Sequence, residues 1–439
     1  MEIINGFQAA KTRLSRKIAL DFGKVSPRSK ETFGREMSPE EVVARILRDV
    51  QEKGDAAVID YTYKFDRFKI ASLEVNRRQI KESYNNVDKV LIEALKLAAG
   101  RIRAFHQEQK DMIWHGVEGK EWGQLVRPLE RVGLYAPGGT ATLASSVLMI
   151  AIPPRVAGVK EIILSTPPTD KGTISPLMLV AADIAGVDRV FGMGGAQAIG
   201  AMAYGTQSVP KVDKICGPGN SFIVLAKKAV FGIVDIDALQ GPSEVLIIAD
   251  ESARAEYCAA DLLAQAEHGQ LPFAILITTS RKLAHEVEEE LKKQLAELPR
   301  REIASESLEK NGIIAIVENV DEAIQLSNLF APEHLELAIK SAGSYLDRVE
   351  NAGCVFLGEY STEPIGDYVA GPNHSLPTGG TARFSSPLNI LDFMKIIDVV
   401  KIDRRGLKKL GPPAMAIARA EGLEAHARAV EKRLLQLEN

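Results

Sequence analysis

From about residue 130 onward, short runs rich in valine and isoleucine alternate with alanine-rich stretches of helical character. The runs form two series: the first comprises 131–135, 161–164, 189–191 and 213–215, and the second 245–249, 273–278, 313–317 and 354–357. Such alternation of strand and helix signals is typical of parallel sheets covered by helices on both faces. The sequence therefore predicts an α/β fold with two Rossmann-like lobes, divided near Gln240-Gly241-Pro242.

The segments outside this alternation are predicted to be an N-terminal arm and a helical C-terminal tail. Near the start, Ser38-Pro39-Glu40-Glu41 has the capping serine, early proline and later glutamate of a helix that should end before Gly54. The tail is predicted to be mostly helical after Gly411-Pro412-Pro413, with a break at Gly422. We expect its narrow apolar stripe to dock on another lobe or another subunit; the stripe comprises Leu423, Ala427, Val430, Leu434 and Leu437.

Chain length supports a division into several regions, because 439 residues are enough for two or three domains. We predict an arm at 1–29, a first lobe at 30–244, a second lobe at 245–384 and a tail at 385–439. An alternative assigns residues 114–133 to the second lobe.

The overall charge and the cysteines limit the kinds of partner and compartment. With 54 Lys and Arg against 58 Asp and Glu, the net charge of −4 gives no basic footprint for nucleic acid or an anionic membrane. Cys216, Cys258 and Cys354 lie far apart, which suits a reducing compartment better than a disulfide framework. The first residues lack the continuous apolar core of a signal peptide, and no stretch is long and apolar enough to span a bilayer. We therefore expect a cytoplasmic protein with a small-molecule substrate.

Gln265 and His268 stand three residues apart near the end of a predicted helix that Gly269 should terminate. An amide oxygen and an imidazole nitrogen on one face could bind a borderline metal such as zinc. The alternative is a polar helix end, where histidine interacts with the negative pole of the helix dipole. The local sequence leaves both interpretations open.

Glu333 and His334 open an alternating segment that follows Pro332, and this segment is predicted to be a strand. A carboxylate beside an imidazole at a strand mouth suits acid–base catalysis. The alternative is an edge strand whose polar face, with His334 and Glu336, is solvated.

Two further segments carry candidate residues. A loop rich in glycine and proline, 364–380, contains Asp367 and His374, and such loops concentrate binding residues as well as ordinary turn chemistry. In the tail, a break at Gly422 could bring Glu421 and His426 together, although a solvent-facing helix also accounts for Glu421.

No dinucleotide-binding fingerprint occurs in the glycine-rich segments. The segment from Gly192 to Gln197 has glutamine where the third glycine of GxGxxG should stand, and Gly195 to Gly200 lacks the Lys and Ser/Thr of a P-loop. Tyr135 and Asn220 nevertheless lie at or just after predicted strands, where open α/β sheets bind ligands. A nucleotide site in the first lobe is predicted from position, not from a motif.

Taken together in this order, these segments resemble the histidinol dehydrogenase family from about residue 30 to about residue 430. The most specific parts are Gly241-Pro-Ser243-Glu244 with 260–268, and Ala331-Pro-Glu333-His334-Leu335-Glu336. The resemblance implies NAD-dependent oxidation of histidinol to histidine through an aldehyde, the last steps of histidine biosynthesis, in a zinc enzyme that uses two NAD+.

The resemblance also implies a role for each candidate residue. It assigns zinc to Gln265, His268, Asp367 and His426, and NAD to Tyr135, Gln197 and Asn220. Contacts with histidinol fall on Ser243, His334 and Glu421, together with the four zinc ligands. His334 is the implied base and Glu333 the implied activator of water. In the family the tail crosses to the partner of a homodimer, so Glu421 and His426 would complete the other subunit's site.

Three other functions compete with this one. Relatives in the family oxidise other small polar alcohols, including sulfonated diols, but Glu421 with His426 resembles the histidinol-specific form. A zinc hydrolase could use Glu333 beside His334, yet it would leave the region of Gly139, Gln197 and Asn220 without a purpose. A non-catalytic scaffold is disfavoured by the complete set of candidate ligands and catalytic residues.

Overall fold

The computed structural model describes residues 1–16, 25–26, 29–68, 72–113, 116, 121–138, 143–169 and 172–437. The chain forms two units, one comprising 1–110 with 129–393 and the other 111–128 with 394–439. The first unit contains both predicted α/β lobes, and each has an all-parallel sheet. The predicted fold class is therefore confirmed.

The sheet of the first lobe has the order β5-β4-β3-β6-β7. Its strands are β3 (Arg131–Tyr135), β4 (Glu161–Thr166), β5 (Arg189–Gly192), β6 (Lys214–Cys216) and β7 (Asp235–Ile236). The chain moves outward from β3 to β5, then returns to place β6 on the other side of β3. This reversal puts a topological switch point at the carboxyl ends of β3 and β6, where α/β sheets bind ligands.

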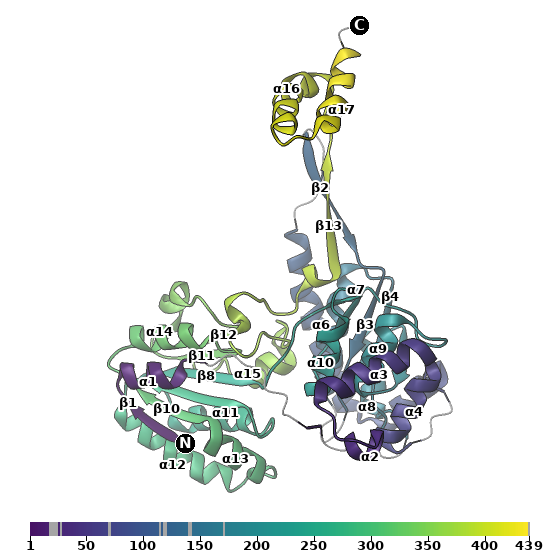
Figure 1. The fold of residues 1–439 in the computed structure, drawn as a ribbon. Helices are drawn as coiled ribbons and strands as arrows, with labels where there is room; N and C mark the ends of the chain where they lie inside the picture. Colours follow the sequence, from purple (N-terminus) through teal and green to yellow (C-terminus); the bar gives the residue numbers. More distant parts are fainter. Residues whose placement is uncertain are drawn as a thin grey trace. The chain divides into compact units, whose positions relative to one another are not determined.

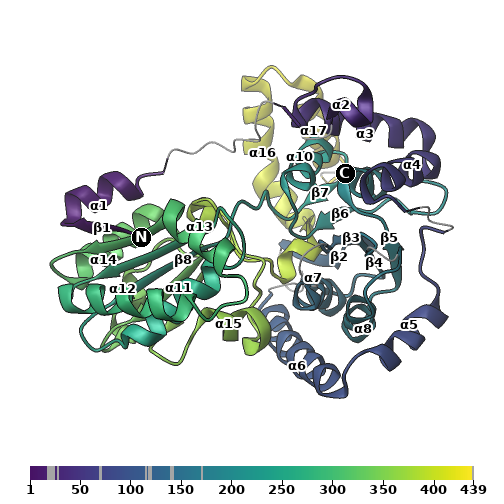
Figure 2. The same ribbon diagram turned by 90° about the horizontal axis from the view of Figure 1, so that it is seen from below.

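Helices cover both faces of this sheet (Figure 2). On one face lie α9 (Gly195–Tyr204) and α10 (Ser221–Val230), and α3 (Pro39–Lys53) and α4 (Asp55–Asp66) pack against these two helices. On the other face lie α7 (Ala144–Ala157) and α8 (Pro176–Ala185). The remaining helices are α2 (Ser29–Phe33), α5 (Arg77–Ser83) and α6 (Lys89–Asp111). The predicted capping box opens α3, since Glu41 N–H donates to Ser38 Oγ and Ser38 N–H donates to the Glu41 carboxylate.

The sheet of the second lobe has the order β1-β10-β9-β8-β11-β12. Its strands are β1 (Glu2–Asn5), β8 (Glu244–Ala249), β9 (Phe273–Thr278), β10 (Gly312–Ile316), β11 (His334–Ala338) and β12 (Cys354–Leu357). Because β11 lies between β8 and β12, the edge-strand alternative for Glu333 and His334 is wrong. Glu336, expected on a solvated face under that alternative, is buried.

The two faces of this second sheet carry different helices (Figure 1). Leu246 and Ile248 of β8 face α1 (Phe7–Leu14) and α14 (Val320–Phe330), whereas Val245 and Ile247 face the opposite layer, since neighbouring strand residues point to opposite sides. That layer comprises α11 (Ala255–Ala266), α12 (Arg281–Leu295) and α13 (Arg301–Asn311).

The structure shows where the N-terminal arm and parts of the segment 114–133 lie. The arm contributes β1, which pairs with β10 in the second sheet. The alternative that assigned 114–133 to the second lobe does not hold for two parts of this segment. Residues 131–133 belong to β3, in the sheet of the first lobe. Residues 122–128 form β2 (Trp122–Pro128), which belongs to the second unit and to neither lobe. Residues 114–115 and 117–120 lie outside the described residues. The other domain boundaries stay predictions.

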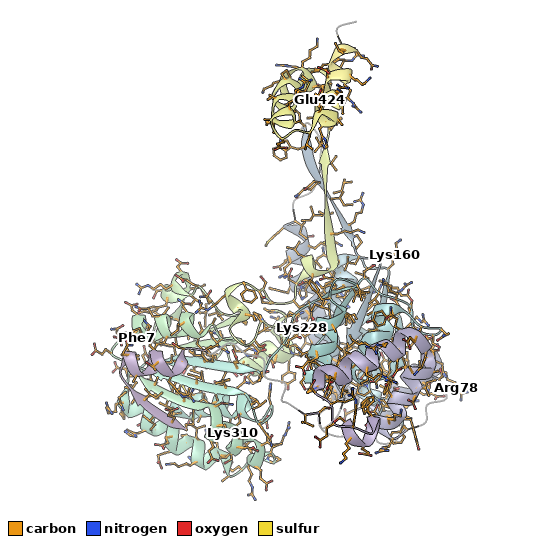
Figure 3. All side chains as sticks on the ribbon, viewed as in Figure 1. Phe7, Arg78, Lys160, Lys228, Lys310 and Glu424 are labelled. Atoms are coloured by element: carbon orange, nitrogen blue, oxygen red, sulfur yellow. The ribbon has the colours of Figure 1, made fainter. Side chains whose placement is uncertain are left out.

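The second unit consists of a two-stranded antiparallel ribbon and two helices. β2 pairs with β13 (Met394–Val400), which leads to α16 (Arg404–Ala420) and α17 (Glu424–Leu435), the helix in which Figure 3 labels Glu424. The predicted break is present at Gly422, whose φ of 77° favours glycine. The tail is helical after Pro413, as predicted, but the helix begins earlier than the prolines indicate. Asp403 caps α16 by accepting from Gly406 N–H, and Pro412 and Pro413 lie inside the helix although they have no N–H to donate. Val430 and Leu434 of the apolar stripe contact α16 at Gly411.

Cys216 and Cys258 are free and buried, as suits small apolar side chains. Within the described ranges, none of the helices combines the length and the apolar character needed to cross a membrane.

Candidate active site

Glu333 and His334 lie at the amino end of β11, and both side chains are almost fully buried. The backbone of Glu244 holds both of them. Its N–H donates to Glu333 Oε2 at 2.9 Å, and its carbonyl oxygen lies 3.0 Å from His334 Nδ1. Since a carbonyl oxygen can only accept, this bond places the proton of a neutral imidazole on Nδ1 and leaves Nε2 as the basic nitrogen.

The free nitrogen of His334 is directed toward a carboxylate. Nε2 lies 3.6 Å from Asp367 Oδ1, and no hydrogen-bond partner for it exists among the described residues. Burial disfavours the charged imidazole, but the carboxylates of Glu333, Glu363 and Asp367 outweigh burial and raise the pKa of His334 well above its usual value. These carboxylates therefore stabilise the imidazolium that forms when His334 accepts a proton.

Two of these carboxyl groups have a raised pKa. Burial raises the pKa of Glu333 to about 8, although the adjacent His334 opposes the shift. Burial likewise raises the pKa of Glu363 to about 7, again opposed by His334. Both groups can therefore exchange protons near neutral pH, which is the property required of an acid–base catalyst.

Glu363 is a candidate site residue that the sequence analysis did not identify. It begins α15 (Glu363–Ile365), and its backbone N–H donates to Glu336 Oε1 at 2.9 Å. Ligand atoms of Glu363, His268 and Asp367 all lie within 4.8 Å of one another. The signal in the sequence was the spacing of Glu363 four residues before Asp367, which places both on one side of a helical turn.

Gln265 lies in the last turn of α11, whereas His268 lies just after the helix has ended. The helix ends at Ala266, and His268 lies in the following turn, where its N–H donates to Gln265 O at 3.3 Å. The helix therefore ends slightly earlier than the predicted termination at Gly269. Gln265 is fully buried, yet neither amide atom has a hydrogen-bond partner in the part of the chain that the structure describes.

A buried amide without hydrogen-bond partners lowers the stability of the folded protein unless a bound ion or molecule interacts with it. Its oxygen, the imidazole of His268 and the carboxylate of Asp367 form a mixed nitrogen and oxygen set of the kind that zinc accepts. The residues present therefore fit a zinc ion.

Ser243 and His374 lie with the catalytic pair around one cavity of about 390 Å³. The cavity is also lined by His268 and Asp367 and, from the first lobe, by Pro137 and Gly138. His374, to which the sequence analysis assigned no role, has its Nδ1 3.0 Å from the carbonyl oxygen of Asp367. It thereby fixes the loop that carries Asp367.

A second cavity, of about 510 Å³, lies at the switch point of the first sheet. Its lining includes the three residues predicted to contact NAD, namely Tyr135, Gln197 and Asn220, and it shares Gly138 with the first cavity. Gln197 is buried, and both of its amide atoms lack a partner within the described segments. Asn220 instead uses its side-chain oxygen to cap α10 through the N–H groups of Phe222 and Ile223.

Asp66, the last residue of α4, also lines this second cavity and was not identified from the sequence. Burial raises its pKa to about 6, and its Oδ2 meets no hydrogen-bond donor in any described part of the chain. A helix C-terminus further disfavours a negative charge. Of the described residues that line the cavity, none is lysine, arginine or histidine.

Glu421 and His426 belong to the second unit. Both are exposed, on either side of Gly422, with Glu421 at the end of α16 and His426 in the first turn of α17. They stay predictions as site residues.

Comparison with known proteins gives consistent matches over nearly the whole chain. A family model described as histidinol dehydrogenase matches residues 29–434. A histidinol dehydrogenase of Dehalococcoides mccartyi is 55% identical over 435 residues, covering 99% of this chain and 100% of that protein. Another, from Moorella thermoacetica, is 52% identical over 407 residues, covering 91% and 96%. The crystal structure of histidinol dehydrogenase from Elizabethkingia anophelis is 37% identical, with a TM-score of 0.92, and the match covers 100% of this chain and 99% of that one.

Proposed function

Because the chain belongs to the histidinol dehydrogenase family, we propose that it oxidises L-histidinol to L-histidine through histidinaldehyde, using zinc and two NAD+. One observation carries the proposal. The buried pair Glu333–His334 lines a cavity that shares Gly138 with a second cavity suited to a dinucleotide. Substrate and cofactor could therefore meet at Gly138.

His334 is the proposed base in both oxidations. Its Nε2 accepts the hydroxyl proton while the adjacent carbon transfers a hydride to NAD+. Bonding of Nδ1 to the Glu244 carbonyl keeps Nε2 available, and the surrounding carboxylates stabilise the imidazolium that results. The same nitrogen acts again when the hydrated aldehyde loses its second hydride.

Glu333 is the proposed activator of water between these two steps. Its carboxylate takes a proton from the water that attacks the aldehyde carbon, and its pKa of about 8 makes it a stronger base than an exposed glutamate. Burial of the pair also excludes bulk water, which keeps the reactive aldehyde in the site until it is oxidised.

Gln265, His268, Asp367 and His426 are the proposed zinc ligands. Support comes from the unpartnered amide of Gln265 and the clustering of His268 with Asp367. When bound, zinc supplies a positive charge that binds and orients the substrate. Glu363 adds a second carboxylate that is available to the metal or to a cationic group of histidinol.

For NAD+, we propose contacts with Tyr135, Gln197, Asn220 and Asp66. The unpartnered amide of Gln197 offers both a donor and an acceptor, and Asp66 offers a carboxylate to hydroxyl donors such as those of a ribose. Asp66 would thus play the part of the acidic residue that binds ribose in other dinucleotide sites, although it comes from the end of a helix.

The protein is further proposed to be a cytoplasmic homodimer in which Glu421 and His426 act in the partner's site. Their exposed positions around Gly422 leave both side chains accessible to another molecule. Activity should then rise and fall with dimer formation upon dilution. An active monomer with a full complement of zinc would contradict the exchange of tails.

The proposed function is tested by NADH formation from histidinol and NAD+, before and after treatment with a chelator. We expect activity that is lost on metal removal and restored by zinc. Full activity after complete metal removal would contradict the zinc requirement, and no NADH from histidinol at any zinc level would contradict the function.

A further inference from the structure

Arg16, two residues beyond the end of α1, hydrogen-bonds two segments that carry the candidate active site and lies close to a third at Gly380. We propose that Arg16 is a positioning residue for Glu333 and His334, so that the N-terminal segment is part of the catalytic apparatus. The inference rests on the proposed function. Figure 3 labels Phe7, the first residue of α1, which marks this segment.

The first contact is a two-point ion pair with Glu244. Arg16 Nη1 lies 2.5 Å from Oε1 and Nη2 lies 2.6 Å from Oε2, while the Glu244 side chain exposes only 1% of its surface. This fork geometry is specific to arginine, because a lysine ammonium cannot make both parallel bonds in the same plane. Glu244 is thereby fixed in position and orientation.

The position of Glu244 is important because its backbone hydrogen-bonds both residues of the catalytic pair, Glu333 and His334. Its N–H donates to Glu333, and its carbonyl oxygen bonds Nδ1 of His334. A rotation of this one peptide segment would change both hydrogen bonds together. The position of the basic nitrogen of His334 therefore depends on the pairing of Glu244 with Arg16.

The second contact reaches the chain immediately before Glu333. Arg16 Nε donates to the carbonyl oxygen of Phe330 at 2.8 Å, and the guanidinium carbon lies 3.7 Å from the centre of the Phe330 ring. Phe330 ends α14, and the next residue, Ala331, has a φ of 53°, which is unfavourable for any residue other than glycine. Arg16 thus stabilises a strained turn that delivers Glu333 to the site.

The third contact involves the loop that follows His374. Gly379 N–H donates to Glu244 Oε1 at 3.0 Å, and a Cβ at Gly380 would come within 3.1 Å of Arg16 Cδ. Gly380 also has a φ of 82°, so this close approach is possible only for glycine without strain. The guanidinium therefore bonds the start of β8 and the turn before β11 directly, and Glu244 connects it to this loop.

The test compares Arg16→Ala with Arg13→Ala. Arg13 is a matched control, because it belongs to the same segment and, among the described residues, its side chain forms an exposed pair with Glu2 at 2.7 Å and no bond to the candidate site. We expect Arg16→Ala to lower kcat about 100-fold, the size of effect caused by a displacement of catalytic groups of about 1 Å. The KM for histidinol and the zinc content should stay close to those of the wild type, and Arg13→Ala should retain wild-type kcat.

Two further measurements separate positioning from general stability. Guanidinium at a non-denaturing concentration should restore part of the kcat of Arg16→Ala and leave Arg13→Ala unchanged. Arg16→Lys should fold but keep a reduced kcat, because lysine cannot replace the two-point contact. If Arg16→Ala fails to fold, Arg16→Lys decides the question.

Several results would overturn the inference. They are a wild-type kcat in Arg16→Ala or in Arg16→Lys, an equal loss in Arg13→Ala, or a loss in Arg16→Ala that guanidinium does not reduce. Failure of the proposed function is distinguishable, since the wild-type chain itself would then form no NADH from histidinol, and both proposals would fall.

Discussion

Replacement of Asp66 by asparagine should have opposite effects on stability and on NAD+ binding. The carboxylate is partly buried, it ends α4, and among the described residues nothing donates to its Oδ2. The side chain therefore costs stability, and under the proposed function a hydroxyl group of the bound nucleotide supplies the missing partner. The substitution Asp66→Asn removes the charge and keeps the size of the side chain.

The expected change in the free energy of unfolding follows from the pKa of Asp66, which burial raises from 3.8 to about 6. The difference between these two pKa values corresponds to about 3 kcal/mol, and partial exposure to solvent reduces this to about 1–2 kcal/mol. Because the pKa in the folded state is raised, the cost is absent below pH 3.8, grows as the pH rises to about 6, and is constant above it. Asp66→Asn should therefore stabilise the protein at pH 8, and the gain should shrink below pH 6.

The expected loss of affinity for NAD+ follows from the hydrogen bonds that we propose between the Asp66 carboxylate and hydroxyl groups of the nucleotide. Bonds to a charged acceptor contribute about 1.5–3 kcal/mol, against about 1 kcal/mol for neutral partners, so we expect NAD+ to bind about tenfold more weakly. Preference for NAD+ over NADP+ should decrease, since the variant has no carboxylate to repel a 2′-phosphate. For the wild type, the KM for NAD+ should fall as the pH rises through about 6, because only the ionised carboxylate accepts both hydroxyl donors.

The assay combines urea unfolding at pH 8 and pH 5 with titration of NAD+ and NADP+. Asp60→Asn is the matched control, because Asp60 is on the same helix but is exposed and pairs with Lys64 at 2.7 Å. Lower stability of Asp66→Asn at pH 8 would refute the electrostatic reasoning. Unchanged affinity for NAD+ would refute the assignment of Asp66 to the nucleotide.

Other substitutions test the remaining parts of the site. Glu333→Gln should slow the second oxidation more than the first, so that aldehyde accumulates and can be trapped; equal slowing of both steps would argue against its role with water. His334→Gln should lower both steps by about 10²- to 10⁴-fold, the usual contribution of a general base, measured in single-turnover experiments with histidinol and with the aldehyde. Gln265→Ala should lower zinc content measured by metal analysis, and full zinc occupancy in that variant would exclude the amide as a ligand. His426→Ala should lower zinc content in the dimer as well, and mixing it with Gln265→Ala should restore some activity if tails are exchanged.

Sequence periodicity predicted the buried strands well because their apolar character is set locally. Predicted runs coincide with β3, β9 and β12 and differ by one or two residues at β4, β5, β6, β8 and β10. The strand β7 has only two residues, and β1 pairs with β10, some 310 residues later, so neither produces a local signal. Long-range pairing is the information that a single sequence lacks.

Candidate residues were found where chemistry was concentrated in one segment, as at Glu333 and His334. Glu363, Asp66 and Arg16 were missed because their importance comes from neighbours distant in the chain. Arg16, for example, contacts Glu244, 228 residues away. The ends of helices were also difficult to predict. The start of α16 before its prolines and the end of α11 before His268 depend on packing rather than on residue type.

The location of the site in the second lobe also could not be predicted from topology. Ser243, Glu333 and His334 lie at the amino ends of β8 and β11, whereas α/β sheets commonly bind ligands at the carboxyl ends. The first lobe follows that common rule at Tyr135 and Asn220.

The most direct test of the central claim, that one site performs both oxidations, is to count NADH and histidine formed from a limiting amount of histidinol. A trap for free aldehyde should be present throughout. We predict two NADH for each histidine and no trapped aldehyde. One NADH per histidinol consumed, with the aldehyde recovered in the trap, would contradict the claim.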